Sequence, residues 1–218
     1  MPYSIILPVH NEEKHIPELL SGLEPYASRH EILVVNDGST DGSLELVQDC
    51  SFITLVNLKE NSGKGAAIRI GLIHANYDKI VLTDGDLELN PAELDQLMIL
   101  DDEEPKTCVF GTRYSTINPF HSVLDLGNFF FTGLFNFIHQ KNLTDALCCA
   151  KAFFKFQVDP KKLKSTGFDI DVELAALLSS QNSYLKEVSL TYTRRDWSEG
   201  KKLRLKDGWS ILKRLMGW

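Results

Sequence analysis

Long hydrophobic runs are missing from this sequence. No apolar stretch approaches the roughly 18 to 20 residues that a membrane-spanning helix needs, and the N-terminus lacks the pattern of a signal peptide. We therefore expect a cytoplasmic chain that at most lies peripherally on the cytoplasmic face of a membrane. With 218 residues, 43% of them hydrophobic, the chain is long enough to bury a substantial core as a single domain.

Cysteine is also scarce, and its spacing is uninformative for metal or disulfide chemistry. The four cysteines are Cys50, Cys108, Cys148 and Cys149. They show no CxxC spacing, and two of them are adjacent, which is a poor geometry for a disulfide. A reducing compartment is the simplest interpretation, so we do not expect a disulfide-stapled secreted domain.

A general excess of positive charge is absent, because the formal net charge is −7. Residues 194–218 are the exception, with eight basic side chains against three acidic ones. No basic-aromatic platform or known binding motif accompanies them, so we expect no nucleic-acid partner. Arginine and lysine both bind phosphate well. This segment therefore predicts contact with phosphate groups or with an anionic membrane surface, unless it is a solvated loop.

What the sequence does contain is a regular alternation of apolar segments and helical patterns. We expect strands at residues 4–8, 31–37, 52–58 and 79–83. Strands that alternate with helices of about 10–15 residues indicate a parallel sheet with crossover helices, so the predicted fold class is α/β. Ligands of such sheets bind outside the carboxyl ends of the strands.

Polar motifs stand at several of these predicted strand ends. Asp84 and Asp86 follow the fourth strand, Asp37 ends the second, and residues 61–65 follow the third. Two carboxylates one residue apart suit Mg²⁺ or Mn²⁺, which bind through one or two carboxylates plus substrate phosphates. Taken alone, the Asp-x-Asp pattern also fits a turn or a helix cap. Its convergence with the other motifs on one edge of the sheet favours a metal site.

Four of these segments resemble, in order and spacing, the nucleotide-binding half of the family 2 glycosyltransferases, which have the GT-A fold. They are residues 8–13, 36–41, 61–65 and 84–86. The similarity continues through residues 111–114, 143–148, Lys151, Phe153, residues 167–174, and Arg194 with the basic loop after it, and so covers essentially the whole chain. These later segments look like the branch that glycosylates polyprenyl phosphates, the dolichyl-phosphate mannose and glucose synthases. The chain departs from that branch at Leu147, Cys149 and Ala150.

The resemblance implies a single GT-A domain in which residues 1–115 bind the nucleotide sugar, UDP- or GDP-linked, and residues 116–218 bind the acceptor. It implies Asp86 as a direct metal ligand, Asp84 as a contact to the ribose or to the metal, and Asp37 as the acceptor of a hydrogen bond from the nucleobase. Further donor-binding candidates are Pro8, Val9, Glu12, Gly63, Lys64, Gly65 and, as an additional contact, Glu88.

The acceptor decides which other residues are catalytic. A hydroxyl acceptor needs a carboxylate to remove its proton, and Asp171 or Glu173 at the start of a predicted helix is the candidate base. These two side chains point in different directions on a helix, so at most one faces the reaction centre. A lipid phosphate is already anionic and needs positioning and charge screening instead. The candidates for that task are Arg113, Arg194, Lys201 and Lys202. The basic set favours a polyprenyl phosphate acceptor, and the resemblance implies a metal-dependent, inverting transfer; a saccharide or lipid-linked glycan hydroxyl is the alternative acceptor.

Two predicted helices carry unusual apolar surfaces. Residues 124–139 include five phenylalanines, more than an ordinary amphipathic stripe needs. Residues 207–218 place Trp209, Leu212, Leu215 and Met216 roughly on one face. Either helix could pack on the core or lie in a membrane interface.

Two other classes fit less well. A nucleotidyltransferase would carry a glycine-rich N-terminal loop with an arginine and a lysine, and residues 8–11 do not. A non-catalytic sugar-nucleotide-binding protein would not need both aspartates and the basic loop.

Overall fold

A computed structural model describes residues 1–114, 122–180, 184–195, 202 and 207–217. Seven described strands form one sheet in the order β3-β2-β1-β4-β6-β5-β7. Their bounds are β1 Tyr3–Val9, β2 Glu31–Asp37, β3 Ile53–Leu58, β4 Lys79–Leu82, β5 Thr107–Thr112, β6 Lys151–Phe154 and β7 Tyr184–Ser189. Every pairing is parallel except those of β6 with β4 and β5. The predicted α/β class with a mostly parallel sheet is confirmed.

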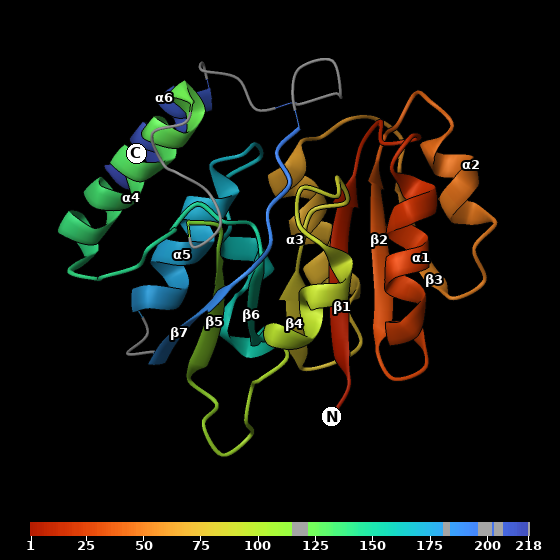
Figure 1. The fold of residues 1–218 in the computed structure, drawn as a ribbon, viewed down its shortest axis with the longest axis horizontal. Helices are drawn as coiled ribbons and strands as arrows, with labels where there is room; N and C mark the ends of the chain where they lie inside the picture. The colour runs from red at the N-terminus through yellow and green to blue at the C-terminus, as the bar shows by residue number, and fades with distance from the viewer. Residues whose placement is uncertain (115–121, 181–183, 196–201, 203–206, 218) are drawn as a thin grey trace.

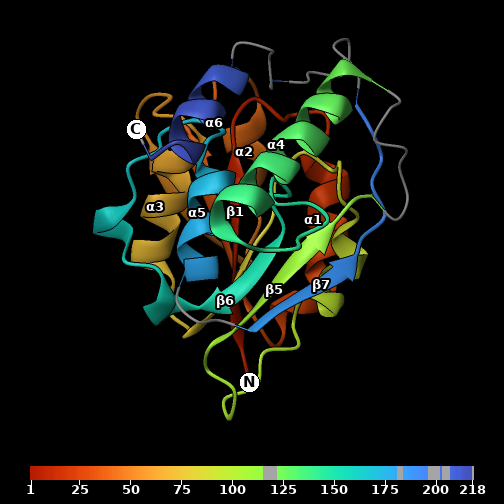
Figure 2. The ribbon, with the colours of Figure 1, turned by 90° about the vertical axis from the view of Figure 1, so that its left-hand side faces the viewer.

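Helices cover both faces of this sheet (Figures 1 and 2). One face packs against α3 and α5, beyond which lie α4 and α6, and the other packs mainly against α1 and a 3₁₀ helix. The α-helices are α1 Ile16–Ala27, α2 Ser43–Gln48, α3 Lys64–His74, α4 Val123–His139, α5 Ile170–Ser180 and α6 Asp207–Leu215, and the 3₁₀ helices are Pro91–Gln96, Lys155–Gln157 and Pro160–Lys162. The five inner strands, β1, β2, β4, β5 and β6, are buried on both sides, which explains their largely apolar sequences, whereas the edge strands β3 and β7 are partly exposed.

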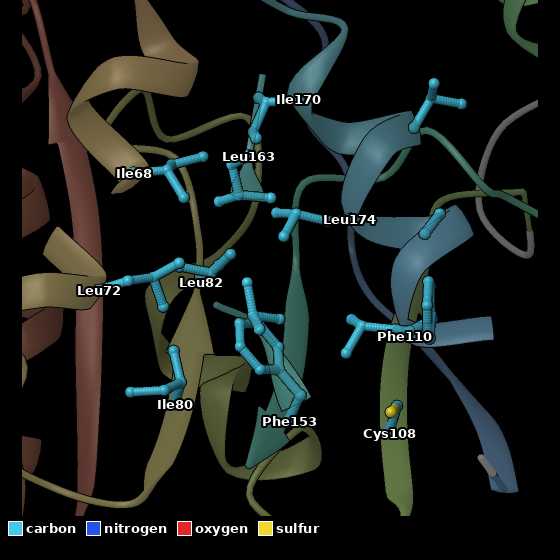
Figure 3. Packing of buried hydrophobic residues seen from close by; sticks show 14 of the residues in the cluster. Ile68, Leu72, Ile80, Leu82, Cys108, Phe110, Phe153, Leu163, Ile170 and Leu174 are labelled. Atoms are coloured by element: carbon cyan, nitrogen blue, oxygen red, sulfur yellow. The ribbon is translucent and has the colours of Figure 1, made fainter. Parts of the chain in front are cut away.

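The core beneath α3 and α5 is dense (Figure 3). Phe110 and Phe153 on neighbouring strands are fully buried together with Leu72 of α3 and Leu174 of α5. Gly71 of α3 faces the sheet so closely that a Cβ there would lie 2.5 Å from Ile6 Cγ2. The small residues of α3 therefore bring this helix, and the loop that begins it, close to the strand ends.

The segment after Asp84 and Asp86 leads into the 3₁₀ helix Pro91–Gln96, where the side chain of Asn90 accepts a hydrogen bond from Ala92 N (3.0 Å). In α6 the buried side chains are Ile211 and Leu215, whereas Trp209 is 61% exposed and Met216 is also exposed. The predicted face is therefore divided: Leu215 packs on the core, whereas Trp209 and Met216 lie on the surface. No helix in the described part of the chain is long and apolar enough to cross a membrane.

Candidate active site

A cavity of about 640 Å³ lies outside the carboxyl ends of the parallel strands. Its walls come from the segments that follow β1, β2, β4, β5 and β7, and from α4, α5 and α6. The predicted site residues that line it are Pro8, Val9, Glu12, Asp37, Gly63, Lys64, Asp84, Asp86, Glu88, Arg113, Asp171, Arg194 and Lys202. Motifs that are far apart in the sequence thus meet in one cavity, as the strand-end argument predicts.

Asp37 is positioned by backbone groups. Its two carboxylate oxygens accept hydrogen bonds from Ser62 N (2.7 Å) and Gly63 N (2.9 Å), and the side chain is almost fully buried. A carboxylate oxygen has room for a second hydrogen bond. The loop that follows β3 therefore fixes Asp37 at the cavity wall, with acceptor capacity for a ligand.

Gly63 and Gly65 of this loop lie so close to another backbone segment that neither has room for a side chain. Gly63 has a φ of +91°, and a Cβ on it would lie 2.2 Å from the carbonyl oxygen of Thr166. A Cβ on Gly65 would lie 2.3 Å from the carbonyl oxygen of Ser165, while Gly65 N donates to Thr166 O (2.9 Å). These contacts show that the close approach is to residues 165–166, which join the start of α3 to the loop before α5.

Lys64 joins two carboxylates from different elements. Its Nζ lies 2.8 Å from Asp84 after β4 and 2.8 Å from Asp171 on α5. Burial lowers the pKa of Lys64, but the charges of Asp171 and Asp84 outweigh it and raise the pKa well above the ordinary value. Burial alone would raise the pKa of Asp84, but the charge of Lys64 and its hydrogen bond outweigh burial, so the pKa of Asp84 is lowered. Lys64 therefore stays charged, and Asp84 stays ionised beside it.

Asp86 lies in a more negative environment. Its Oδ1 accepts a hydrogen bond from Glu88 N (3.1 Å), and its Oδ2 from Arg195 Nη2 (3.0 Å). Burial, followed by the charges of Asp84 and Glu88, raises the pKa of Asp86 to about 7 despite Arg195. An additional cation in the cavity would therefore stabilise its ionised form.

Arg195 is a cavity-lining residue that the sequence argument missed, since that argument chose its neighbour Arg194. Arg195 Nη1 lies 2.8 Å from Glu12 Oε2, and Glu12 also pairs with Lys202 and with His15 Nδ1 (2.8 Å). Arg195 and Glu12 are both buried. Glu12 thus anchors the segment around Arg195 to the start of α1. The one available signal was the pair of adjacent arginines, which left open which of them enters the cavity.

Two other arginines reach the cavity from β5 and from the segment after β7. Arg113 makes a bidentate pair with Asp145, with distances of 2.7 Å and 2.9 Å. Arg194 donates to Ser122 Oγ (2.8 Å) and pairs with Asp125 at the start of α4. Asp145 and Asp125 are both buried. Two buried carboxylates therefore hold two guanidinium groups in fixed positions at the cavity wall.

The remaining predicted residues lie elsewhere. Glu173 does not line the cavity; its carboxylate accepts hydrogen bonds from Lys164 N (2.9 Å) and Ser165 N (2.8 Å). Glu173 follows Asp171 by two positions on α5, and side chains two positions apart point in different directions on a helix. Gly65 does not line the cavity, and its N–H donates to Thr166 O. Lys201 lies outside the described residues. Of the two candidate bases, only Asp171 faces the cavity.

The donor set around Asp86 fits a divalent ion. Among the described residues, no group of three or more His, Cys, Asp or Glu side chains could by itself hold a metal. Mg²⁺ and Mn²⁺, however, commonly bind through one or two carboxylates and complete their shell with phosphate oxygens and water. Burial, followed by the charges of Asp84 and Glu88, raises the pKa of Asp86, and such an ion would stabilise its ionised form. Asp86, with Asp84 beside it, would hold the ion.

Comparison with known proteins defines the class and then the family. The fold is that of the GT-A glycosyltransferases. It resembles glucosyl-3-phosphoglycerate synthase from Mycobacterium tuberculosis, solved with Mn²⁺, UDP and phosphoglyceric acid, with a TM-score of 0.77 and 17% identity over 99% of this chain and 78% of that one. It also resembles residues 1–349 of TarS from S. aureus, solved with UDP-GlcNAc, with a TM-score of 0.64 and 17% identity over 99% of this chain and 65% of that one.

Residues 4–158 match the family model for glycosyl transferase family 2, and the chain belongs to this family. Among sequence relatives, an undecaprenyl-phosphate 4-deoxy-4-formamido-L-arabinose transferase from Salmonella choleraesuis (strain SC-B67) is 36% identical over 109 residues, 46% of this chain and 33% of that protein. The Salmonella newport (strain SL254) protein of the same name gives the same identity and coverage. The match therefore spans about a third of the length of these relatives.

Proposed function

We propose that this protein transfers a sugar, with inversion, from a UDP- or GDP-linked donor to a polyprenyl phosphate such as dolichyl or undecaprenyl phosphate, with Mg²⁺ or Mn²⁺ as cofactor. Membership in family 2 supports sugar transfer. The names of the Salmonella relatives support a polyprenyl phosphate acceptor, and the Mn²⁺ and UDP bound to the structural neighbour support the donor and the metal.

The observation that carries the proposal is the distribution of charge across one cavity. Asp37, Asp84 and Asp86 follow β2 and β4, whereas Arg113 and Arg194 follow β5 and β7, which lie at the other end of the sheet order. We assign the β1–β4 side to the nucleotide sugar and the β5–β7 side to the acceptor phosphate. Asp37, Asp84 and Asp86 lie in the donor half predicted for residues 1–115 and Arg194 lies in the acceptor half predicted for residues 116–218, whereas Arg113 is assigned to the acceptor side from within residues 1–115.

On the donor side, each residue has a distinct task. Asp37 accepts a hydrogen bond from the nucleobase, and Pro8, Val9 and Glu12 shape the base and ribose pocket. Asp86 and Asp84 hold the metal ion, which when bound supplies the positive charge that stabilises the diphosphate leaving group. Lys64 adds a second fixed charge and keeps Asp84 ionised.

On the acceptor side, the residues position an existing nucleophile. A phosphate oxygen attacks the anomeric carbon from the face opposite the diphosphate, the glycosidic bond to the diphosphate breaks, and the configuration inverts. No proton is removed in this step, so no general base is required. Arg113, Arg194, Lys201 and Lys202 hold and screen the anionic acceptor, as arginine and lysine do for phosphates.

The surroundings of the two candidate bases agree with this assignment. Asp171 lines the cavity, which keeps a hydroxyl acceptor as the second candidate function. Its carboxylate is paired with Lys64 at 2.8 Å, so one of its oxygens is already engaged by that cation. Glu173 is bound to backbone N–H groups away from the cavity. A phosphate acceptor needs neither of them.

A polyprenyl acceptor also requires contact with a membrane surface, and we propose that the protein binds peripherally at the cytoplasmic face. Helices α4 and α6 lie side by side next to the cavity (Figure 1). Phe130 and Phe137 of α4 are 61% and 76% exposed, and Trp209 of α6 is exposed beside Lys213, whose Nζ lies over its ring. Aromatic side chains next to basic groups suit a lipid headgroup region.

The test is a donor and metal screen with purified protein. UDP- and GDP-sugars are incubated with farnesyl phosphate and either Mn²⁺, Mg²⁺ or EDTA, and released nucleoside diphosphate is measured. We expect release that depends on one donor, on the metal and on the lipid phosphate. Release that is unchanged by EDTA, or that ignores farnesyl phosphate, would contradict the proposal.

A further inference from the structure

The segment after β7 holds the carboxylate loop after β4 at several points. Thr193 N donates to Glu88 O (2.8 Å), Arg195 N donates to Glu88 Oε1 (3.3 Å), and Tyr192 pairs with Leu89 in an isolated β-bridge. Because Asp86 accepts a hydrogen bond from Glu88 N, the position of Glu88 also determines that of Asp86. The two segments therefore form one unit, although about 100 residues separate them.

Tyr192 is the residue of this segment that contacts both sides of the cavity. Its hydroxyl lies 2.9 Å from Glu88 Oε2, and its ring lies beneath the guanidinium carbons of Arg113 and Arg194, at 5.5 Å and 5.9 Å from the ring centroid. Burial, followed by the charge of Glu88, raises the pKa of Tyr192, so the hydroxyl stays protonated and donates.

The two arginines are confined between this ring and acidic side chains. Asp145 holds Arg113 in a bidentate pair, and Asp125 holds Arg194. The carboxylates fix one edge of each guanidinium, and the shared aromatic ring fixes a face. The spacing of the two guanidinium groups therefore depends on the Tyr192 ring, a role that a hydroxyl group alone does not supply.

We propose that Tyr192 is a positioning residue that sets the spacing of Arg113 and Arg194 for an anionic acceptor through its ring, and orients Glu88 in the donor loop through its hydroxyl. This inference rests on the proposed function, because it takes the acceptor to be a phosphate. It separates the two tasks within one side chain: the ring serves the acceptor side, and the hydroxyl serves the donor side.

Two substitutions separate the tasks. Tyr192→Phe keeps the ring and removes the hydrogen bond to Glu88, whereas Tyr192→Leu removes both. Tyr184→Leu is the matched control, since Tyr184 is 67% exposed at the start of β7 and does not line the cavity. The dissociation constants of UDP with Mn²⁺ and of farnesyl phosphate are measured by calorimetry for each variant, together with the melting temperature.

We expect both Tyr192 variants to weaken UDP·Mn²⁺ binding equally, by about threefold, the scale of one lost hydrogen bond. We expect only Tyr192→Leu to weaken farnesyl phosphate binding, by about tenfold, the scale of two lost cation–π contacts. The control should change neither. Equal farnesyl phosphate affinity in the Phe and Leu variants, or losses of both ligands that follow the melting temperature, would overturn the inference alone. Failure of the unmodified protein to bind farnesyl phosphate would overturn the proposed function and this inference with it.

Discussion

On the β2 side of the cavity, Asp37 is held by the backbone N–H groups of Ser62 and Gly63. On the β4 side, Asp84 and Asp86 are instead paired with the side-chain cations of Lys64 and Arg195. The first arrangement joins the ends of two neighbouring strands, β2 and β3, through backbone groups and carries no compensating charge. The second is a network of opposite charges drawn from distant parts of the chain. The β2 side therefore offers a fixed acceptor for a neutral base, and the β4 side offers charges that can be redistributed around a metal and a diphosphate.

The largest expected effect comes from removing a carboxylate of the β4 side. Asp86→Ala should reduce sugar transfer by more than about 10³-fold, because the metal loses its direct ligand. The fold should remain intact, since Asp86 lies in a turn. The measurement is metal-dependent release of nucleoside diphosphate, with Asp101→Ala in an exposed loop as the control. Persistent metal-dependent turnover in the Asp86 variant would refute its assignment as the metal ligand.

The next largest effect concerns stability. Arg195→Ala leaves the buried Glu12 with fewer cationic partners, and we expect the free energy of unfolding to fall by about 3 kcal/mol, the scale for breaking a buried pair. Lys162→Ala removes an ion pair whose lysine is largely exposed and should leave stability unchanged. Denaturant unfolding measures both. Equal stability of the Arg195 variant and the unmodified protein would show that Arg195 does not anchor this side of the cavity.

The charge network also predicts a pH dependence. Because the pKa of Asp86 is raised to about 7 in the folded protein, the folded state holds more protons than the unfolded state between about pH 4 and pH 7. This group therefore lowers the stability of the metal-free protein as pH rises through that range. Asp86→Asn should gain stability relative to the unmodified protein over the same range, by up to a few kcal/mol, since one pKa unit is about 1.4 kcal/mol.

Unfolding of both proteins at pH 5 and pH 8, in the presence of EDTA, measures this difference. A constant stability difference between the two proteins would contradict the raised pKa. Addition of Mn²⁺ and UDP at pH 8 should stabilise the unmodified protein more than the Asp86→Asn variant.

The smallest effect is expected on the β2 side. Asp37→Asn should weaken nucleotide binding by about 1 to 2 kcal/mol, the scale for losing a charge-assisted hydrogen bond. Asp41→Asn is a suitable control, because Asp41 also accepts backbone hydrogen bonds but does not line the cavity. Calorimetric titration with UDP and GDP gives the affinities. Unchanged affinity in the Asp37 variant would make Asp37 a purely structural residue of the loop.

The same contrast explains what the sequence could predict. The parallel sheet and the cavity at its strand ends follow from local patterns, because apolar strands alternate with helices and each polar motif directly follows a strand. Asp171 faces the cavity and Glu173 does not, as expected for two residues that are two positions apart on a helix. Asp37, Lys64, Asp84 and Asp86 all line the predicted cavity for this reason.

Arg195 could not be identified in this way. Its partner Glu12 lies 183 positions earlier in the chain, and only the tertiary fold brings the two together. The sequence also left open whether the apolar face of α6 packs on the core or lies in a membrane interface; in the structure Ile211 and Leu215 are buried, whereas Trp209 and Met216 are exposed. Hydrophobic pattern identifies a helix more reliably than it identifies which residues the core accepts.

The most direct test of the account is a comparison of two acceptors that differ only in charge. Initial rates of nucleoside diphosphate release are measured with farnesyl phosphate and with farnesol, for the unmodified protein and for Arg194→Ala, Lys201→Ala with Lys202→Ala, Asp171→Asn and Glu173→Gln. We predict turnover with farnesyl phosphate only, large losses in the basic variants, and milder losses in the two carboxylate variants. Turnover with farnesol or a free sugar, together with a loss of about 10² to 10⁴-fold in Asp171→Asn, would contradict a phosphate acceptor and assign Asp171 as a general base.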